Sequence, residues 1–156
     1  MLDTKLITLL EYRIQQEELS SRIYEQMSLW LEDKGYLNLA KVYSTYSKEE
    51  LTHARWAKDF LLNYGLTPNL KVLTAPDLDL NNLNDVFQQT LDHELEVTKQ
   101  CEEMASIALK LNNHGMYALA SKYCAEQVEE IGKSITNLDI LKLSSDMLVI
   151  DNYFKA

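Results

Sequence analysis

The chain has very few residues that readily end a helix, and this limits its fold more than any other feature. Only four glycines and two prolines occur in 156 residues. A fold of many short strands needs a turn about every ten residues, and such turns draw heavily on glycine and proline. The sequence therefore predicts a few long helices joined by few connections.

Apolar residues recur every three or four positions over four long segments, which is the pattern of amphipathic helices. Together with a short fifth helix, the predicted segments are about 5–33, 38–64, 83–111, 116–143 and 146–154. Residues suited to begin or end them are Asp3 or Thr4, Gly35, Gly65, Asn81 or Asn82, and Gly115. The first two helices, and likewise the third and fourth, have short links and should be antiparallel neighbours.

A longer connection separates the second helix from the third. Residues 65–81 could extend over roughly 55 Å at about 3.3 Å per residue. A helix of about 27 residues is roughly 40 Å long. The connection can thus return along the full length of the bundle. The sequence predicts an all-α protein, a four-helix bundle with one long crossover and a short fifth C-terminal helix.

Charge and cysteine content exclude several classes of protein. With 15 Lys+Arg and 24 Asp+Glu, the formal charge is −9, which argues against a nucleic-acid binder or an anionic-membrane binder. Cys101 and Cys124 form no C-x-x-C pair, which argues against a disulfide scaffold, a zinc ribbon and a rubredoxin-type iron site. We see neither a signal peptide nor a long apolar run, and we expect a soluble cytoplasmic protein.

Polar residues interrupt each apolar stripe near the middle of its helix. In chain order they are Glu17, Glu50, His53, Glu94, Gln127 and Glu130. The midpoints of full-length helices lie at one level of a bundle, so these side chains should converge. Glu17 is the inward residue of the Glu17–Glu18 pair, because Glu17 lies two turns from both Leu10 and Tyr24.

Such a convergence indicates a metal centre. An isolated carboxylate in a core costs several kcal/mol, and four together also repel one another. Two divalent cations would balance four glutamates, and oxygen ligands with one imidazole and no thiolate suit iron or manganese. A single glutamate in a stripe can reflect a misassigned register. The prediction therefore depends on all four helices being interrupted at the same level.

These motifs resemble those of the non-haem bacterial ferritins. The segments that carry the resemblance are Ser20-Ser21, Tyr24-Glu25-Gln26-Met27-Ser28, Trp30, Glu49-Glu50-x-x-His53, His93-Glu94, and Glu126-Gln127-x-Glu129-Glu130. The resemblance covers nearly the whole chain. It implies a single ferritin-like domain over residues 1–156, with a di-iron ferroxidase centre inside the bundle.

The resemblance also assigns roles to individual residues. Glu17, Glu50 and His53 would bind the first iron, with Glu50 bridging to the second. The second iron would be bound by Glu94 and Glu130, with Gln127 as a further candidate. Tyr24 would orient a ligand carboxylate. Residues matching a third iron site are Glu49, Glu126, Glu129 and the shared Glu130; the alternative is that these acids form a solvated face.

Three positions separate the chain from related groups. The fourth helix carries Gln127-x-x-Glu130 where bacterioferritins and carboxylate oxidases have a second Glu-x-x-His. Thr52 stands where bacterioferritins have a haem-binding methionine, so we expect no haem. Lys122 stands where bacterial ferritins usually have tryptophan, so the aromatic electron donor beside the centre is expected to be absent.

The resemblance implies an iron-storage protein that oxidises Fe(II) with oxygen or peroxide and keeps Fe(III) as a mineral inside a hollow shell of twenty-four identical subunits. Two alternatives remain open at this point. One is a di-iron or di-manganese oxidase or peroxidase, although the lack of a C-x-x-C pair weighs against a rubrerythrin. The other is a non-catalytic shell subunit.

Overall fold

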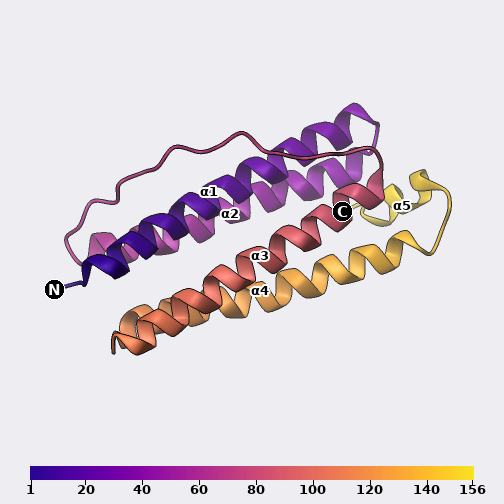
Figure 1. The fold of residues 1–156 in the computed structure, drawn as a ribbon. Helices are drawn as coiled ribbons and strands as arrows, with labels where there is room; N and C mark the ends of the chain where they lie inside the picture. The colour runs from indigo at the N-terminus through magenta and orange to yellow at the C-terminus, as the bar shows by residue number, and fades with distance from the viewer.

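Five helices and no strand make up the computed structural model, which describes all 156 residues. The helices are α1 (Thr4–Asp33), α2 (Leu37–Asn63), α3 (Leu83–Lys110), α4 (His114–Leu141) and α5 (Met147–Tyr153). The four long helices run side by side and α5 lies at one end of them (Figure 1). The predicted all-α bundle is confirmed. None of the helices is both long and apolar enough to cross a membrane.

The predicted capping residues explain where most helices begin and end. The Asp3 carboxylate accepts a hydrogen bond from the backbone N–H of Lys5 at the start of α1, and the Asn82 side chain accepts one from Asp85 at the start of α3. Gly35 follows α1 with a φ of +87°, and Gly65 follows α2 with a φ of +74°. These left-handed conformations favour glycine because a Cβ would be strained there.

The turn between α3 and α4 differs from the prediction. We expected the fourth helix to begin after Gly115, but α4 begins at His114. Asn112 adopts the left-handed conformation at φ 54°, and the Asn113 side chain caps α4 by accepting from Met116 N. The two asparagines therefore complete the turn before the glycine is reached, because asparagine tolerates both conformations.

The crossover lies along α1 and α2 without regular secondary structure (Figure 1). Two hydrogen bonds attach it to α1: Gln15 Nε2 donates to the Val72 carbonyl at 2.8 Å, and Asn69 N donates to the Glu11 carboxylate at 2.6 Å. The connection begins at one end of the bundle and delivers α3 at the other, as its length predicts. This places the middle of α3 level with the middle of α1.

The apolar core is divided into two clusters, one toward each end of the bundle. One cluster includes Leu6, Leu10, Leu61, Met104 and Met116. The other includes Met27, Leu31, Leu39, Phe87 and Ile150. The buried polar residues of the mid-helix positions lie between them. The fold thus places a polar layer in the centre of the core.

The short helix α5 is attached to the start of α2 through one buried carboxylate. Tyr36, the residue before α2, provides no side-chain cap. Instead Asp151 of α5 accepts from the backbone N–H groups of Asn38 and Leu39, at 3.3 and 2.9 Å. A carboxylate at a helix N-terminus is favoured by both hydrogen bonding and the helix dipole. Asp151 therefore fixes α5 against the bundle.

Candidate metal centre

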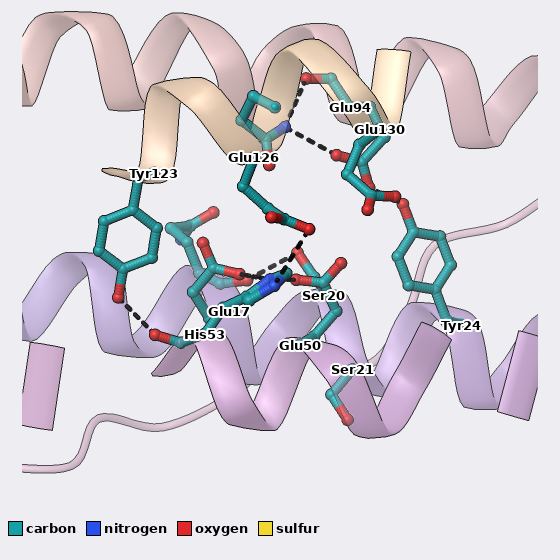
Figure 2. A network of polar contacts seen from close by, with 12 residues as sticks. Glu17, Ser20, Ser21, Tyr24, Glu50, His53, Glu94, Tyr123, Glu126 and Glu130 are labelled. Carbon is teal, nitrogen blue, oxygen red and sulfur yellow. Dashed lines mark hydrogen bonds and ion pairs between the residues drawn. The ribbon is translucent and has the colours of Figure 1, made fainter. Parts of the chain in front are cut away.

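The mid-helix polar residues meet in the polar layer (Figure 2). Glu17 comes from α1, Glu50 and His53 from α2, Glu94 from α3, and Gln127 and Glu130 from α4; all six are buried, with at most 7% of any residue exposed. By contrast, the neighbouring Glu18 carboxylate pairs with Lys58 at 3.1 Å. The six side chains point into the core because each lies a whole number of helical turns from buried apolar residues of the same helix.

Glu17, Glu50 and His53 form the tightest group. One ligand atom from each can be chosen so that all three atoms lie within 4.8 Å of one another. His53 Nδ1 lies 3.1 Å from Glu50 Oε2 and 3.8 Å from Glu17 Oε2. On the other side of the ring, His53 Nε2 lies 3.6 Å from Glu126 Oε1. Two carboxylates and an imidazole at this spacing can hold a divalent cation.

Glu94 is held on both of its oxygens by neutral donors. The Tyr24 hydroxyl donates to Oε1, and Gln127 Nε2 donates to Oε2 at 2.7 Å. Figure 2 shows the Tyr24 ring reaching this carboxylate from α1. In this arrangement Gln127 orients Glu94, as does Tyr24. Both donors fix the direction of the carboxylate without supplying a compensating charge.

The buried carboxylates lack enough partners within the protein. Both oxygens of Glu17 and Oε1 of Glu130 lack a hydrogen bond of good geometry. Their nearest cations are Arg13, with Nε 3.1 Å from Glu17 Oε1, and Lys133, with Nζ 2.8 Å from Glu130 Oε1. Burial, the largest cause in each case, raises the pKa of Glu17, Glu50, Glu94 and Glu130 above the usual glutamate value. These groups therefore favour either a proton or a bound cation, and a divalent metal fits this donor set.

This raised pKa predicts that the metal-free protein loses stability as the pH increases from 6.5 to 8.5. Burial raises the pKa of Glu50 to about 8, whereas an unfolded chain ionises its glutamates near pH 4.5. The folded state thus holds protons that the unfolded state has lost, and this contribution disappears as the pH rises through the folded pKa. We expect the melting temperature, measured by circular dichroism after chelation, to fall by about 5 °C or more.

In this pH range the neighbouring histidine has only a small effect of opposite sign, because the unfolded chain loses the last of its histidine protons just above pH 6.5. His93 contacts Ser20 Oγ at 2.7 Å, and burial lowers its pKa to about 4, so the folded state keeps it neutral throughout. The matched control is Glu50→Gln. The melting temperature of this variant should fall less with increasing pH, because the amide does not ionise. A melting temperature that rises between pH 6.5 and 8.5 in the metal-free protein would contradict the prediction.

The residues assigned to a third iron site do not form a compact group. Glu49 and Glu126 are half-buried and Glu129 is exposed, and no three acidic, histidine or cysteine side chains outside the Glu17–Glu50–His53 group approach as closely. Glu126 turns toward His53 in Figure 2. Their role as iron ligands stays a prediction.

Two neighbours of the centre were not foreseen from the sequence. Arg13 is 1% exposed, and its Nε lies 3.1 Å from Glu17 Oε1. Its position four residues before Glu17 is a helical neighbour spacing and could have revealed it. Trp56 packs on His53 with ring centroids 4.8 Å apart, and Lys122 lies over the Trp56 ring at 3.9 Å. An aromatic ring from α2 therefore lies beside the centre although position 122 carries lysine, and the expected absence of an aromatic electron donor stays a prediction.

Comparison with known proteins agrees with this architecture. The ferritin-like domain model matches residues 7–143, so the chain belongs to the ferritin family. It is 28% identical over 130 residues to the bacterial non-heme ferritin of Escherichia coli O6:H1, covering 83% of this chain and 79% of that protein. The corresponding protein of Staphylococcus haemolyticus is 25% identical over 146 residues, covering 94% and 88%. The resemblance predicted from the motifs is confirmed.

Solved structures show the same fold. A humanized archaeal ferritin superposes with a TM-score of 0.94 at 25% identity and covers 99% of this chain and 96% of that one. The open pore ferritin of Archaeoglobus fulgidus gives a TM-score of 0.93 at 24% identity, covering 98% and 96%. The four-helix arrangement with a long crossover is thus the ferritin fold.

Proposed function

We propose that this protein is an iron-storage ferritin that oxidises Fe(II) at the mid-bundle centre. Iron is the substrate in this proposal, and oxygen or peroxide is the oxidant. Glu17, Glu50 and His53 would bind one ion, and Glu94 with Glu130 would bind the other. The oxidised product would then be stored as an Fe(III) mineral, as expected of the family to which the chain belongs.

The observation that best supports this function is the excess of negative charge in the buried centre, where four glutamates face a single buried cation, Arg13. Ligand atoms of Glu17, Glu50 and His53 approach within 4.8 Å of one another in the core. Glu17 Oε2 has no hydrogen-bond partner, and Oε1 has only the ion pair with Arg13. A purely structural core has no use for such a group, since an apolar replacement would be more stable. A site that binds and releases cations requires it.

The reaction balances with the oxidants named. Two Fe(II) ions each give up one electron, and dioxygen takes both electrons with two protons to leave as hydrogen peroxide. Alternatively, hydrogen peroxide takes two electrons and two protons to form two waters. The protein residues supply negative charge and fixed ligand geometry. Glu17 and Glu50 are suited to accept protons when the ions leave, because burial raises the pKa of both carboxyls.

We expect storage to require assembly of many copies. Twenty-four chains of 18.0 kDa give a closed shell of about 430 kDa. Apolar side chains that are exposed on the isolated chain, including Leu37, Leu70, Val72 and Leu143, offer surface for contacts between subunits. The half-buried Glu49 and Glu126 and the exposed Glu129 would act as additional cation ligands next to the centre.

Sizing combined with aerobic iron loading tests this function. The purified protein should elute near 430 kDa, and Fe(II) added in air should give soluble particles containing about a thousand or more iron atoms each. A capacity of only about two ions per chain would instead indicate a di-iron oxidase or peroxidase. A stable monomer or dimer would contradict storage, while slow loading of an intact shell would indicate a non-catalytic subunit.

A further inference from the structure

Arg13 is a buried cation to which the proposed reaction assigns no role. It lies on α1 between the carboxylate centre and the apolar cluster that contains Leu10 and Met104. Nε lies 3.1 Å from Glu17 Oε1, and the two terminal nitrogens donate to Gln100 Oε1 at 3.1 Å and to Cys101 Sγ at 3.5 Å. The guanidinium group is therefore fixed on three sides.

The centre contains a second cation, but that one is free to leave. Lys133 pairs with Glu130 at 2.8 Å, and 45% of its side chain is exposed, so it can rotate into water when a metal ion arrives. Only 2% of the Arg13 side chain is exposed. Arginine also remains charged at all relevant pH values. Arg13 must therefore stay in place, and charged, when the centre is loaded.

This permanent positive charge changes the charge balance of the metal centre. The glutamates 17, 50, 94 and 130 carry four negative charges, which two divalent cations would neutralise. With Arg13 included, the same two cations leave one positive charge in excess within a buried volume. Because like charges a few ångströms apart repel strongly in a protein interior, this excess should weaken cation binding by about tenfold or more.

We propose that Arg13 is a fixed counter-ion of the metal centre: it holds Glu17 Oε1, leaves Oε2 as the ligand atom, and weakens the binding of divalent cations. This inference rests on the proposed function. Arg13 thus has a positioning and charge-setting role. This role predicts whether a substitution strengthens or weakens cation binding. Removing the charge should tighten binding, whereas a residue that only orients Glu17 would loosen it when removed.

Calorimetric titration with Co(II) alone at pH 7 tests the inference, since Co(II) stays divalent in air. Arg13→Gln should bind Co(II) about tenfold more tightly than the parent protein. The matched control is Arg55→Gln, which makes the same change in net charge at a side chain that is 63% exposed and pairs with Asp59. We expect its Co(II) affinity to stay within about twofold of the parent value, because solvent screens an exposed charge.

Arg13→Lys separates charge from shape and decides the question if Arg13→Gln does not fold. It keeps the charge but loses the planar contacts with Gln100 and Cys101, so an affinity within about threefold of the parent is expected. Equal or weaker Co(II) binding in Arg13→Gln, or a large loss of affinity in Arg13→Lys, would overturn the role of Arg13 alone. If the parent protein binds no Co(II), the proposed function fails instead.

Discussion

Replacement of Glu50 and His53 together by alanine is expected to slow Fe(II) oxidation by about 100-fold or more. Both side chains belong to the group whose ligand atoms lie within 4.8 Å of one another. Their removal leaves Glu17 as the only ligand of that group, which cannot hold an ion alone. The measurement is the initial rate of Fe(III) absorbance after Fe(II) is mixed with oxygenated buffer.

The bundle and its assembly should survive this double substitution. Burial raises the pKa of Glu50, so the carboxyl opposes folding in its charged form, and its loss offsets part of the cost of the cavity. The control is Arg55→Ala with Asp59→Ala, an exposed ion pair on the same helix at 2.8 Å, which should oxidise iron at the parent rate. Parent-like oxidation by the Glu50→Ala, His53→Ala protein would show that the centre lies elsewhere.

Substitution of the two residues that hold Glu94 should give the next largest loss of activity. Tyr24→Phe removes the donor to Oε1, and Gln127→Ala removes the donor to Oε2. Each change frees the carboxylate to rotate, and partners of ligand residues typically contribute about 10- to 100-fold in metal affinity or activity. We expect about a tenfold slower oxidation for each variant, measured in the same absorbance assay.

Tyr43→Phe is the matched control for Tyr24→Phe. Tyr43 is equally buried and packs against Tyr24 with ring centroids 5.9 Å apart, but its hydroxyl pairs with Thr90 at 2.8 Å and not with a carboxylate of the centre. It should lose some stability and keep its oxidation rate. If Tyr24→Phe and Tyr43→Phe lose activity to the same extent, general loosening of the core would explain the effect better than the orientation of Glu94.

Most of the fold could be predicted because long amphipathic helices are determined by local periodicity. The bounds of α1, α2, α3 and α5 agree with the prediction to within one residue, since capping groups such as Asp3 and Asn82 are recognisable in the sequence. The start of α4 was misplaced because asparagine can occupy the left-handed position usually taken by glycine. The sequence alone does not show which of Asn112 and Gly115 will do so.

The candidate ligands could also be located, because a carboxylate on an apolar stripe is conspicuous. The interactions between side chains of different helices could not be predicted from the sequence. Arg13 is a charged residue at the edge of its stripe, and its burial depends on Gln100 and Cys101, which lie more than 80 residues away on α3. The contact of Trp56 with His53 depends on which rotamer each ring adopts. Such details follow from packing and not from periodicity.

The division of the core into two apolar clusters has a mechanical consequence. α1 packs chiefly against α2, and α3 against α4, so the molecule is two hairpins joined face to face. Glu17 and Glu50 belong to one hairpin, and Glu94 and Glu130 to the other. Two bound metal ions would therefore link the hairpins at mid-height, between the two apolar clusters. In the metal-free protein, backbone amides at this level should exchange hydrogen faster than those nearer the apolar clusters, and bound ions should slow this exchange.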